Sequence, residues 1–296
     1  LIHYKVCATF DSSPTIGSIG RATDIGVEFV QPSSCAIVQG IPLLGRYIAF
    51  GNHFTVYGDE RFRLDRHPVM SKHPITPMDE GDIRVHFAKM SDKSVALIDL
   101  VHLEQDFDAV SARYDRYLDD GADIILFDTL NDKHLIDIGR LLHEKAERGT
   151  VFAVGSSGFE YAMGRYWQEA GLLEPPPQYG SIGAAERIIV ISGSAAANTA
   201  EQIKYALSNG FGGVALNTDQ LVDPSTAEDE RKRAVREALA HLAAGRHPLL
   251  YATLGPDDII IQKTHDKIRQ LGIDPSETGR LIATQQGLIL RALLED

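Results

Sequence analysis

Short apolar runs alternate along the chain with longer segments in which apolar residues recur at helical spacing. This alternation is typical of parallel strands joined by crossover helices, so the pattern predicts an α/β fold. The predicted strands are His3–Phe10, Cys35–Val38, Val95–Leu100, Asp123–Phe127, Val151–Val154, Arg187–Ile191, Gly213–Leu216 and Leu249–Thr253. The predicted helices are Ile16–Val30, Pro77–Lys89, Phe107–Asp119, Asp132–Arg148, Tyr161–Ala170, Ala200–Ser208, Glu228–Ala244 and Thr278–Leu294. Because the strand segments are rich in β-branched residues that do not alternate with polar ones, each sheet is expected to be covered on both faces.

The composition changes most clearly at Glu174–Gly180, where three consecutive prolines exclude both a helix and a central strand. We therefore predict two domains, each a mainly parallel sheet flanked by helices: residues 1–174 and 187–296, joined by a linker over 175–186. A second irregular region, about residues 40–73, is too long for an ordinary connection and is interpreted as a functional excursion. Thr76 before Pro77, with two acidic residues in the first turn, predicts a helix start.

Composition restricts the class of partner. The 296 residues are 44% hydrophobic and 24% charged, enough for about two ordinary globular domains. A formal net charge of −12 disfavours nucleic acid and anionic membranes, but leaves room for a small anion in a local basic pocket. The two cysteines, Cys7 and Cys35, do not suggest a disulfide framework. With no signal peptide and no apolar run near about 18 residues, we expect a cytoplasmic protein.

The first cluster that could bind a ligand lies around one predicted strand-to-helix turn. Its cations, hydroxyls and carboxylate suit a hydroxy acid, held by its own carboxylate and hydroxyls. The cluster consists of Lys5, Thr9, Asp11, Ser12, Ser13, Ser18 and Arg21. A Ser-Ser-Pro turn that caps a helix would explain the same spacing, so both interpretations stay open.

Two small-residue loops also follow predicted strands. Ser192-Gly-Ser194 precedes a helix that Asn198 or Thr199 could cap, and phosphate could approach that helix N-terminus. The Gly-Lys-Ser/Thr ending of a P-loop is absent, so a plain tight turn is an equal alternative. Val154–Gly158 either closes over a substrate or packs against a neighbouring loop. Its glycine spacing does not match a serine-hydrolase nucleophile elbow.

Histidines and cations gather in Asp65-Arg-His-Pro68 and Lys72-His-Pro74. The His-x5-His interval matches no familiar metal-ligand spacing, so we predict no metal site here. Anion contact or a scaffold between loops is the preferred interpretation.

Five blocks, in order through the chain, resemble the four-carbon acid sugar kinases. They are Lys5–Gly26, Arg61–Met78, Val154–Gly158, Ile191–Ser194 with Asn198–Ile203, and Leu254–Asp257. The Cys-Ala-Thr-Phe-Asp-Ser-Ser-Pro form of the first block is similar to the branch that acts on 3-oxo-tetronate, with threonate and erythronate kinases as relatives.

This resemblance implies an N-terminal sugar-acid-binding domain and a C-terminal nucleotide-binding domain. The implied reaction transfers the γ-phosphoryl group of ATP, with Mg²⁺, to a four-carbon sugar acid. By the same similarity, the sugar-acid site would comprise Lys5, Thr9, Asp11, Ser12 and Arg21, and Ser192, Gly193 and Ser194 would face ATP. Ala8 stands where relatives often carry serine. The implied partners are the sugar acid and ATP, and a homo-oligomer is left open.

Two motifs usual in that family do not occur in these 296 residues: an early Asp-Asp-Leu-Thr-Gly-type motif and a late Gly-Gly-Asp/Glu-Thr-type phosphate loop. We therefore expect a chain truncated at both ends, weakly active or inactive by itself, because phosphoryl transfer depends on positioning and charge neutralisation. By family analogy the missing N-terminal carboxylates would orient or deprotonate the attacking hydroxyl. The catalytic residues are therefore unknown within this chain.

Two other classes of function remain. A binding module would hold a small hydroxy acid without phosphorylating it, and would retain acid binding without nucleotide binding. A hydrolase or aldolase would need a nucleophile or a Schiff-base lysine in an apolar pocket, for which Lys5 is the one candidate, in polar surroundings.

Overall fold

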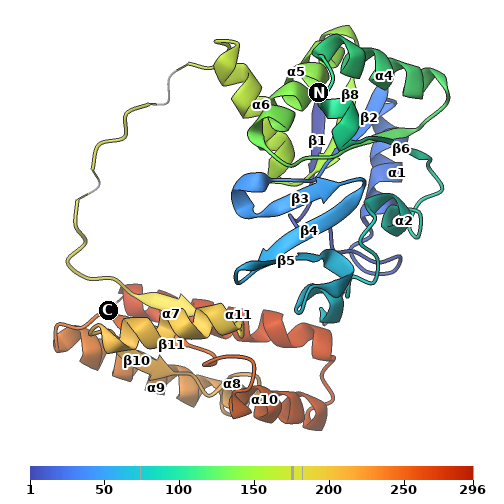
Figure 1. Ribbon diagram of the computed structural model, residues 1–296. Coiled ribbons are helices and arrows are strands. Elements are labelled where there is room, and N and C mark those ends of the chain that lie inside the picture. Colours follow the sequence, from blue (N-terminus) through green and yellow to red (C-terminus); the bar gives the residue numbers. More distant parts are fainter. Residues whose placement is uncertain (74, 175–176, 182, 296) are drawn as a thin grey trace. The chain divides into compact units, whose positions relative to one another are not determined.

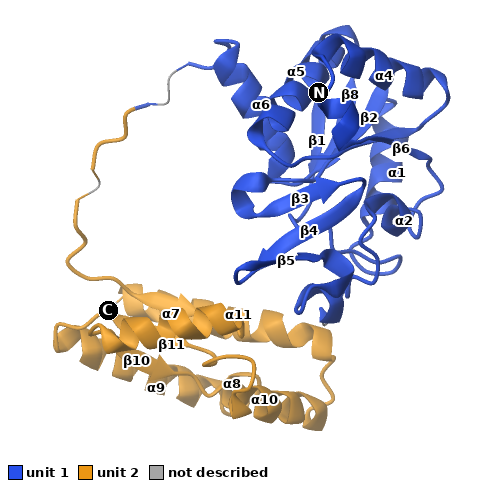
Figure 2. Cartoon of the chain, viewed as in Figure 1, with its two compact units in different colours: residues 1–177 blue, residues 178–296 orange. Residues whose placement is uncertain are grey.

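The computed structural model describes residues 1–73, 75–174, 177–181 and 183–295. The chain divides into two compact units, residues 1–177 and 178–296 (Figure 2). The expected α/β class, with a mainly parallel sheet in each unit, is confirmed. The domain limits at residues 174 and 187 stay a prediction. Pro74 of the histidine-containing loop, and Pro175, Pro176 and Ile182 of the predicted linker, lie outside the described residues.

The main sheet of the first unit is parallel and has the order β1-β8-β2-β7-β6 (Figure 1). Its strands are β1 (Ile2–Lys5), β2 (Ser34–Val38), β6 (Val95–Ile98), β7 (Ile124–Phe127) and β8 (Val151–Gly155). β1 is one of the two edge strands, and it pairs with β8 so that Lys5 lies opposite Gly155. All the carboxyl ends therefore meet at one edge, where open parallel sheets bind their ligands.

Helices cover both faces of this sheet, which is why its strands read as continuous apolar runs. The helices are α1 (Ile19–Val30), α2 (Ile83–Phe87), α3 (Leu100–Leu103), α4 (Phe107–Asp119), α5 (Asp132–Arg148) and α6 (Ser157–Glu169). Successive strand residues point to opposite faces: Ile37 packs in the cluster that includes α1 and α2 residues, and Ala36 in the cluster of α4, α5 and α6. α4 and α5 have the bounds that the sequence predicted.

The excursion over residues 40–73 contains an antiparallel sheet that the sequence pattern did not predict. It consists of β3 (Arg46–Ala49), β4 (Asn52–Tyr57) and β5 (Glu60–Arg63), with short 3-10 turns at Pro42–Leu44, Leu64–Arg66 and Met70–Lys72. Phe50 and Gly51 join β3 to β4, with φ values of 50° and 80°. The buried carboxylate of Asp128 accepts hydrogen bonds from both of their amides, at 2.6 and 2.8 Å, and so fixes this turn to the end of β7.

Two predicted elements near the candidate site are wrong in extent. The strand expected to reach Phe10 ends at Lys5, and residues 7–18 form a loop before α1. The helix expected over Pro77–Lys89 is limited to Ile83–Phe87, and its N-cap is Asp82 rather than Thr76. Thr76 does not cap because its hydroxyl donates to Asp11, 65 residues away in sequence.

The second unit contains a parallel sheet in the order β10-β11-β9. Its elements are β9 (Val190–Ser192), α7 (Ala197–Ser208), β10 (Gly212–Ala215), α8 (Thr218–Leu221), α9 (Ala227–Ala243), β11 (Pro248–Tyr251), α10 (Ile259–Gln270), a 3-10 turn at Pro275–Glu277 and α11 (Thr278–Glu295). Its core joins β10 and β11 to α9 and α11 through side chains such as Val214, Leu250, Ala234 and Ile289. α10 was not predicted. Among the described residues, no helix has the length and apolar character needed to cross a bilayer.

Candidate functional site

The first candidate site lies at the carboxyl edge of the main sheet of the first unit. Lys5 is the last residue of β1, and its ammonium donates to the carbonyl of Val6 at 3.0 Å. Thirteen residues later, Ser18 caps α1 by accepting from the amide of Arg21 at 3.1 Å. Lys5 and Arg21 are both exposed, and among the described residues the Arg21 guanidinium makes no hydrogen bond or ion pair. The two cations therefore flank the loop over residues 7–18, and their role in binding a ligand stays a prediction.

Asp11 is the most engaged side chain of the loop over residues 7–18. One carboxylate oxygen accepts from the hydroxyl of Thr9, and the other accepts from the hydroxyl of Thr76 at 2.8 Å. Burial raises the pKa of Asp11, but these hydrogen bonds outweigh it and leave the pKa below its ordinary value. The carboxylate is therefore ionised and can only accept further hydrogen bonds.

Ser12 lies beneath the loop, with 2% of its surface exposed. Its hydroxyl donates to the carbonyl of Phe10 at 3.0 Å, and the Nε2 atom of His86 lies 3.0 Å from the same oxygen. The structure therefore brings Thr9 and Asp11 together with Thr76, and Ser12 together with His86. That these residues contact a ligand stays a prediction.

Three loops at this edge are tied to one another. The Gln39 amide donates to the carbonyl of Cys7 at 2.9 Å, and the Ser156 hydroxyl donates to the carbonyl of Gln39 at 2.6 Å. A Cβ atom on Gly158 would lie 1.9 Å from the carbonyl oxygen of Gly40, so only glycine permits this approach. Of the two interpretations of the Val154–Gly158 loop, close packing on a neighbouring loop is the one observed.

Several polar groups of the histidine-containing loop are occupied by local contacts. Arg63 forms a two-point ion pair with Asp65, at 2.7 and 2.6 Å. His67 accepts from the amides of Val69 and Met70, each at 3.1 Å. Within the described residues, no group of three or more His, Cys, Asp or Glu side chains is arranged to hold a metal ion. The contacts are those of a loop scaffold.

In the second unit, a cavity of about 130 Å³ opens at the carboxyl ends of the three parallel strands. Gly193 follows β9, Thr218 follows β10, and Thr253 follows β11; threonine, apolar and histidine side chains of α10 and α11 complete the lining. The lining residues are Gly193, Ala195, Thr218, Ala252, Thr253, Ile261, Thr264, His265, Thr278 and Ile282. No lysine or arginine is among them, so this cavity suits an uncharged ring better than a triphosphate.

Of the residues predicted to face ATP, Ser192, Gly193 and Ser194, the cavity lining includes Gly193. The Ser192 carbonyl accepts from the amide of Ala252 at 2.9 Å and from the Gln286 side chain at 3.1 Å. The Ser194 hydroxyl accepts from the amide of Ala196 at 3.2 Å and from the Thr199 hydroxyl at 3.1 Å. The expected cap by Asn198 or Thr199 is wrong, because α7 begins at Ala197, before both residues, and its N-cap residue is Ala196.

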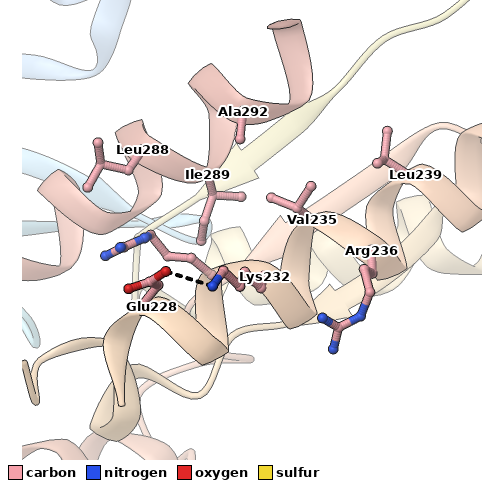
Figure 3. A pocket seen from close by; sticks show the side chains of 9 residues that line it. Glu228, Lys232, Val235, Arg236, Leu239, Leu288, Ile289 and Ala292 are labelled. Atoms are coloured by element: carbon pink, nitrogen blue, oxygen red, sulfur yellow. Dashed lines mark ion pairs between the residues drawn. The ribbon is translucent and has the colours of Figure 1, made fainter. Parts of the chain in front are cut away.

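A larger groove of about 430 Å³ lies between α9 and α11 of the second unit (Figure 3). Val235, Leu239, Leu288, Ile289 and Ala292 supply its apolar side chains. The cations along it are Arg231, Lys232 and Arg236, and Lys232 pairs with Glu228 at 2.6 Å. The groove lies along two helices rather than at the strand ends, so we do not assign it to the nucleotide.

Comparison with known proteins identifies the two units. A family described as a sugar-binding N-terminal domain matches residues 1–163, and one described as a nucleotide-binding C-terminal domain matches residues 189–296. The chain belongs to the four-carbon acid sugar kinase family. The resemblance inferred from the five sequence blocks is thus confirmed.

Curated members of the four-carbon acid sugar kinase family align over most of the chain. The 3-oxo-isoapionate kinase of Paraburkholderia graminis is 35% identical over 295 residues, covering 100% of this chain and 62% of that protein. The 3-oxo-tetronate kinase of Pectobacterium atrosepticum is 26% identical and covers 87% of this chain and 58% of that protein. The chain thus spans about three fifths of the length of these relatives. A crystal structure from Salmonella typhimurium LT2 shares the fold, with a TM-score of 0.71, 23% identity, and coverage of 99% of this chain and 64% of its own.

Three residues at the first candidate site are not predicted from the sequence. Thr76 was interpreted as a helix cap, His86 as part of a longer helix, and Gln39 was not singled out. Each acts through a contact with a residue more than 30 positions away: Thr76 with Asp11, His86 with Ser12, and Gln39 with Cys7. No local sequence signal marks such contacts.

Proposed function

We propose that this chain is part of an ATP-dependent kinase that phosphorylates a small sugar acid, a four-carbon one by the sequence resemblance. 3-Oxo-tetronate is the substrate that the first sequence block favours, and threonate and erythronate are the alternatives. The 35% identity to a 3-oxo-isoapionate kinase adds that acid to the candidates. The observation that carries the proposal is the pair of exposed cations, Lys5 and Arg21, flanking a loop with an ionised acceptor, Asp11.

The chemistry of the first site matches that class of substrate. Lys5 and Arg21 supply charge-assisted hydrogen bonds for a carboxylate. Asp11 accepts from a substrate hydroxyl, and the neighbouring Thr9 hydroxyl adds a second polar contact. Together they would orient the acid, and positioning is the main contribution of protein groups to phosphoryl transfer.

We assign the nucleotide to the second unit, with its base at the cavity beside Gly193 and Thr253. The threonine hydroxyls and apolar side chains there fit a purine ring in chemistry, and the absence of cations from this lining directs the phosphates elsewhere. Mg²⁺ is commonly held by one or two carboxylates together with substrate phosphates rather than by an all-protein cage. It would neutralise phosphate charge when bound with ATP. Within this chain we name no catalytic base.

Calorimetry with threonate and with an ATP analogue tests the proposal directly. We expect the chain to bind both, and Lys5→Met and Arg21→Met each to weaken threonate binding by about tenfold or more, since a hydrogen bond to a charged group contributes about 1.5–3 kcal/mol. Arg148→Met is the matched control, because Arg148 is exposed at the end of α5, at the opposite edge of the sheet.

The alternatives give different results in the same experiment. A binding module would hold threonate but no ATP analogue, and would form no phosphorylated product. If the wild-type chain binds neither ligand, or if Arg148→Met weakens threonate binding as much as Lys5→Met does, the assignment of this site is wrong.

A further inference from the structure

The loop over residues 7–18 contains a strained residue at its centre. Phe10 has φ of 55°, a left-handed conformation that an aromatic residue rarely adopts, and its side chain is completely buried. Such a conformation persists only where the surrounding structure over-determines it. The contacts that hold the loop therefore decide what it can present to a ligand.

One restraint acts through α2. The ring of Phe10 packs in the core cluster that contains Phe87, and lies 6.3 Å edge-on from the ring of His86. Since the single hydroxyl proton of Ser12 goes to the Phe10 carbonyl, His86 must donate to Ser12 from Nε2. Burial lowers the pKa of His86, so its imidazole is neutral near pH 7 and its one ring proton is on Nε2. His86 and Ser12 thus fix the backbone of the loop.

The second restraint acts on the side chain of Asp11. Thr76 is 6% exposed and lies in the segment between the antiparallel sheet and α2, so it belongs to a different part of the unit from the loop. Its hydroxyl donates to one Asp11 oxygen at 2.8 Å, while Thr9 donates to the other. These two donors fix the plane of the carboxylate, and each oxygen keeps a lone pair for a further donor.

We propose that Thr76 is a positioning residue for the sugar-acid site: it holds Asp11 as an oriented acceptor for a substrate hydroxyl without itself contacting the substrate. This inference rests on the proposed function, and it makes the site selective for acids that present a hydroxyl donor to Asp11. A substrate analogue with a hydrogen in place of this hydroxyl would leave one carboxylate oxygen of Asp11 without a partner. A mismatch of this kind discriminates most strongly between substrates.

Thr76→Val tests the role, because valine keeps the shape of the side chain and removes its donor. Thr76→Ser keeps the donor and should restore wild-type behaviour. Ser71→Ala is the matched control: the Ser71 hydroxyl also makes a short contact, 2.7 Å to the carbonyl of His67, but within its own turn.

The first measurement needs no ligand. In hydrogen exchange, we expect the amides of residues 7–18 to exchange several-fold faster in Thr76→Val than in the wild type, and at the wild-type rate in Ser71→Ala and Thr76→Ser. Unchanged exchange of the loop in Thr76→Val would overturn the proposed restraint, whatever the protein binds.

The second measurement is threonate binding by calorimetry. We expect Thr76→Val to raise Kd about tenfold with the thermal midpoint of the first unit nearly unchanged, and Thr76→Ser to bind as the wild type does. Equal Kd values for Thr76→Val and wild type would contradict the positioning role. A wild type that binds no sugar acid would instead contradict the proposed function, and the exchange result would still stand.

Discussion

At the scale of single residues, His53 shows how the first unit accommodates a polar side chain in its interior. It lies in β4 opposite Ile48, it is 1% exposed, and neither ring nitrogen has a hydrogen-bond partner among the described residues. Burial, followed by the nearby charge of Arg46, lowers its pKa to about 3. The imidazole is therefore neutral in the folded protein at any ordinary pH.

This burial predicts a loss of stability in acid. In the unfolded chain the histidine takes up a proton below about pH 6.5, while in the folded chain it does so near pH 3. The stability that neutral His53 preserves is complete above pH 6.5 and is lost as the pH falls toward 3, at up to about 1.4 kcal/mol per pH unit.

Chemical denaturation of His53→Leu and wild type between pH 7 and pH 4 measures this contribution. We expect the free energy of unfolding of the variant to fall less steeply, although His3, His67 and His86, whose pKa values are also lowered by burial, keep some slope in both proteins. If the free energy of unfolding falls equally steeply with pH in both proteins, His53 does not cause the loss of stability in acid.

At the scale of elements, the packing of α5 on α6 depends on a glycine. A Cβ atom on Gly139, in the middle of α5, would lie 2.1 Å from the carbonyl oxygen of Ala162 in α6. The backbones of α5 and α6 are therefore in close contact at this point. The apolar cluster on that face of the sheet includes side chains of both helices. Gly164, also in α6, has no atom within 4 Å of its would-be Cβ.

Alanine at these two glycines should have opposite effects. Gly139→Ala must separate the helices, and we expect a loss of about 1–3 kcal/mol or more in the free energy of unfolding. Gly164→Ala should stabilise by up to about 1 kcal/mol, because alanine is the better helix former. Thermal and urea unfolding of both variants measure the difference; comparable effects would mean that α5 and α6 can separate without cost.

How well an element could be predicted depends on whether local sequence or a tertiary contact sets its limits. α4 and α5 have clear apolar periodicity with Asp106 and Asn131 as N-caps, and their bounds follow from sequence alone. The antiparallel sheet carries turn signals, Phe50-Gly51 and Gly58-Asp59, that mark two-residue hairpins, and the sequence interpretation missed them. The segment after Thr76 could not be predicted, because its hydroxyl serves a tertiary contact in place of a helix cap.

The candidate site likewise combines residues that are close in sequence with residues that are far apart. The sequence could suggest Lys5, Thr9, Asp11, Ser12 and Arg21 because they lie close together around one turn. Their partners Thr76 and His86 come from 60 to 75 positions away, and only the folded chain brings them to the loop. Local spacing can thus suggest which groups form a site, but not what holds them.

At the scale of the whole chain, each unit has a core of its own. Two apolar clusters lie within the first unit, on the two faces of its main sheet, and a third lies within the second unit. We therefore expect each unit to fold without the other. Arg187 is exposed and precedes β9, where a protease can reach an extended backbone.

Limited trypsin digestion tests this independence. We expect early cleavage after Arg187 and two resistant fragments, residues 1–187 and 188–296, with threonate binding retained by the first and nucleotide-analogue binding by the second. Arg187→Gln should remove the early cut. Digestion without resistant fragments, or fragments that have lost their secondary structure by circular dichroism, would show that the units depend on each other.

The two cysteines differ in exposure, and this difference allows a label to be attached selectively at the loop over residues 7–18. Cys35 is buried in β2, and burial raises its pKa to about 12, whereas Cys7 is exposed at the start of the loop, with its sulfur 3.1 Å from the Thr9 hydroxyl. Reagents that require a thiolate will therefore modify Cys7 in preference to Cys35. The chain consequently contains its own attachment point for a fluorophore or spin label, next to the residues proposed to bind the sugar acid, with no engineered cysteine required.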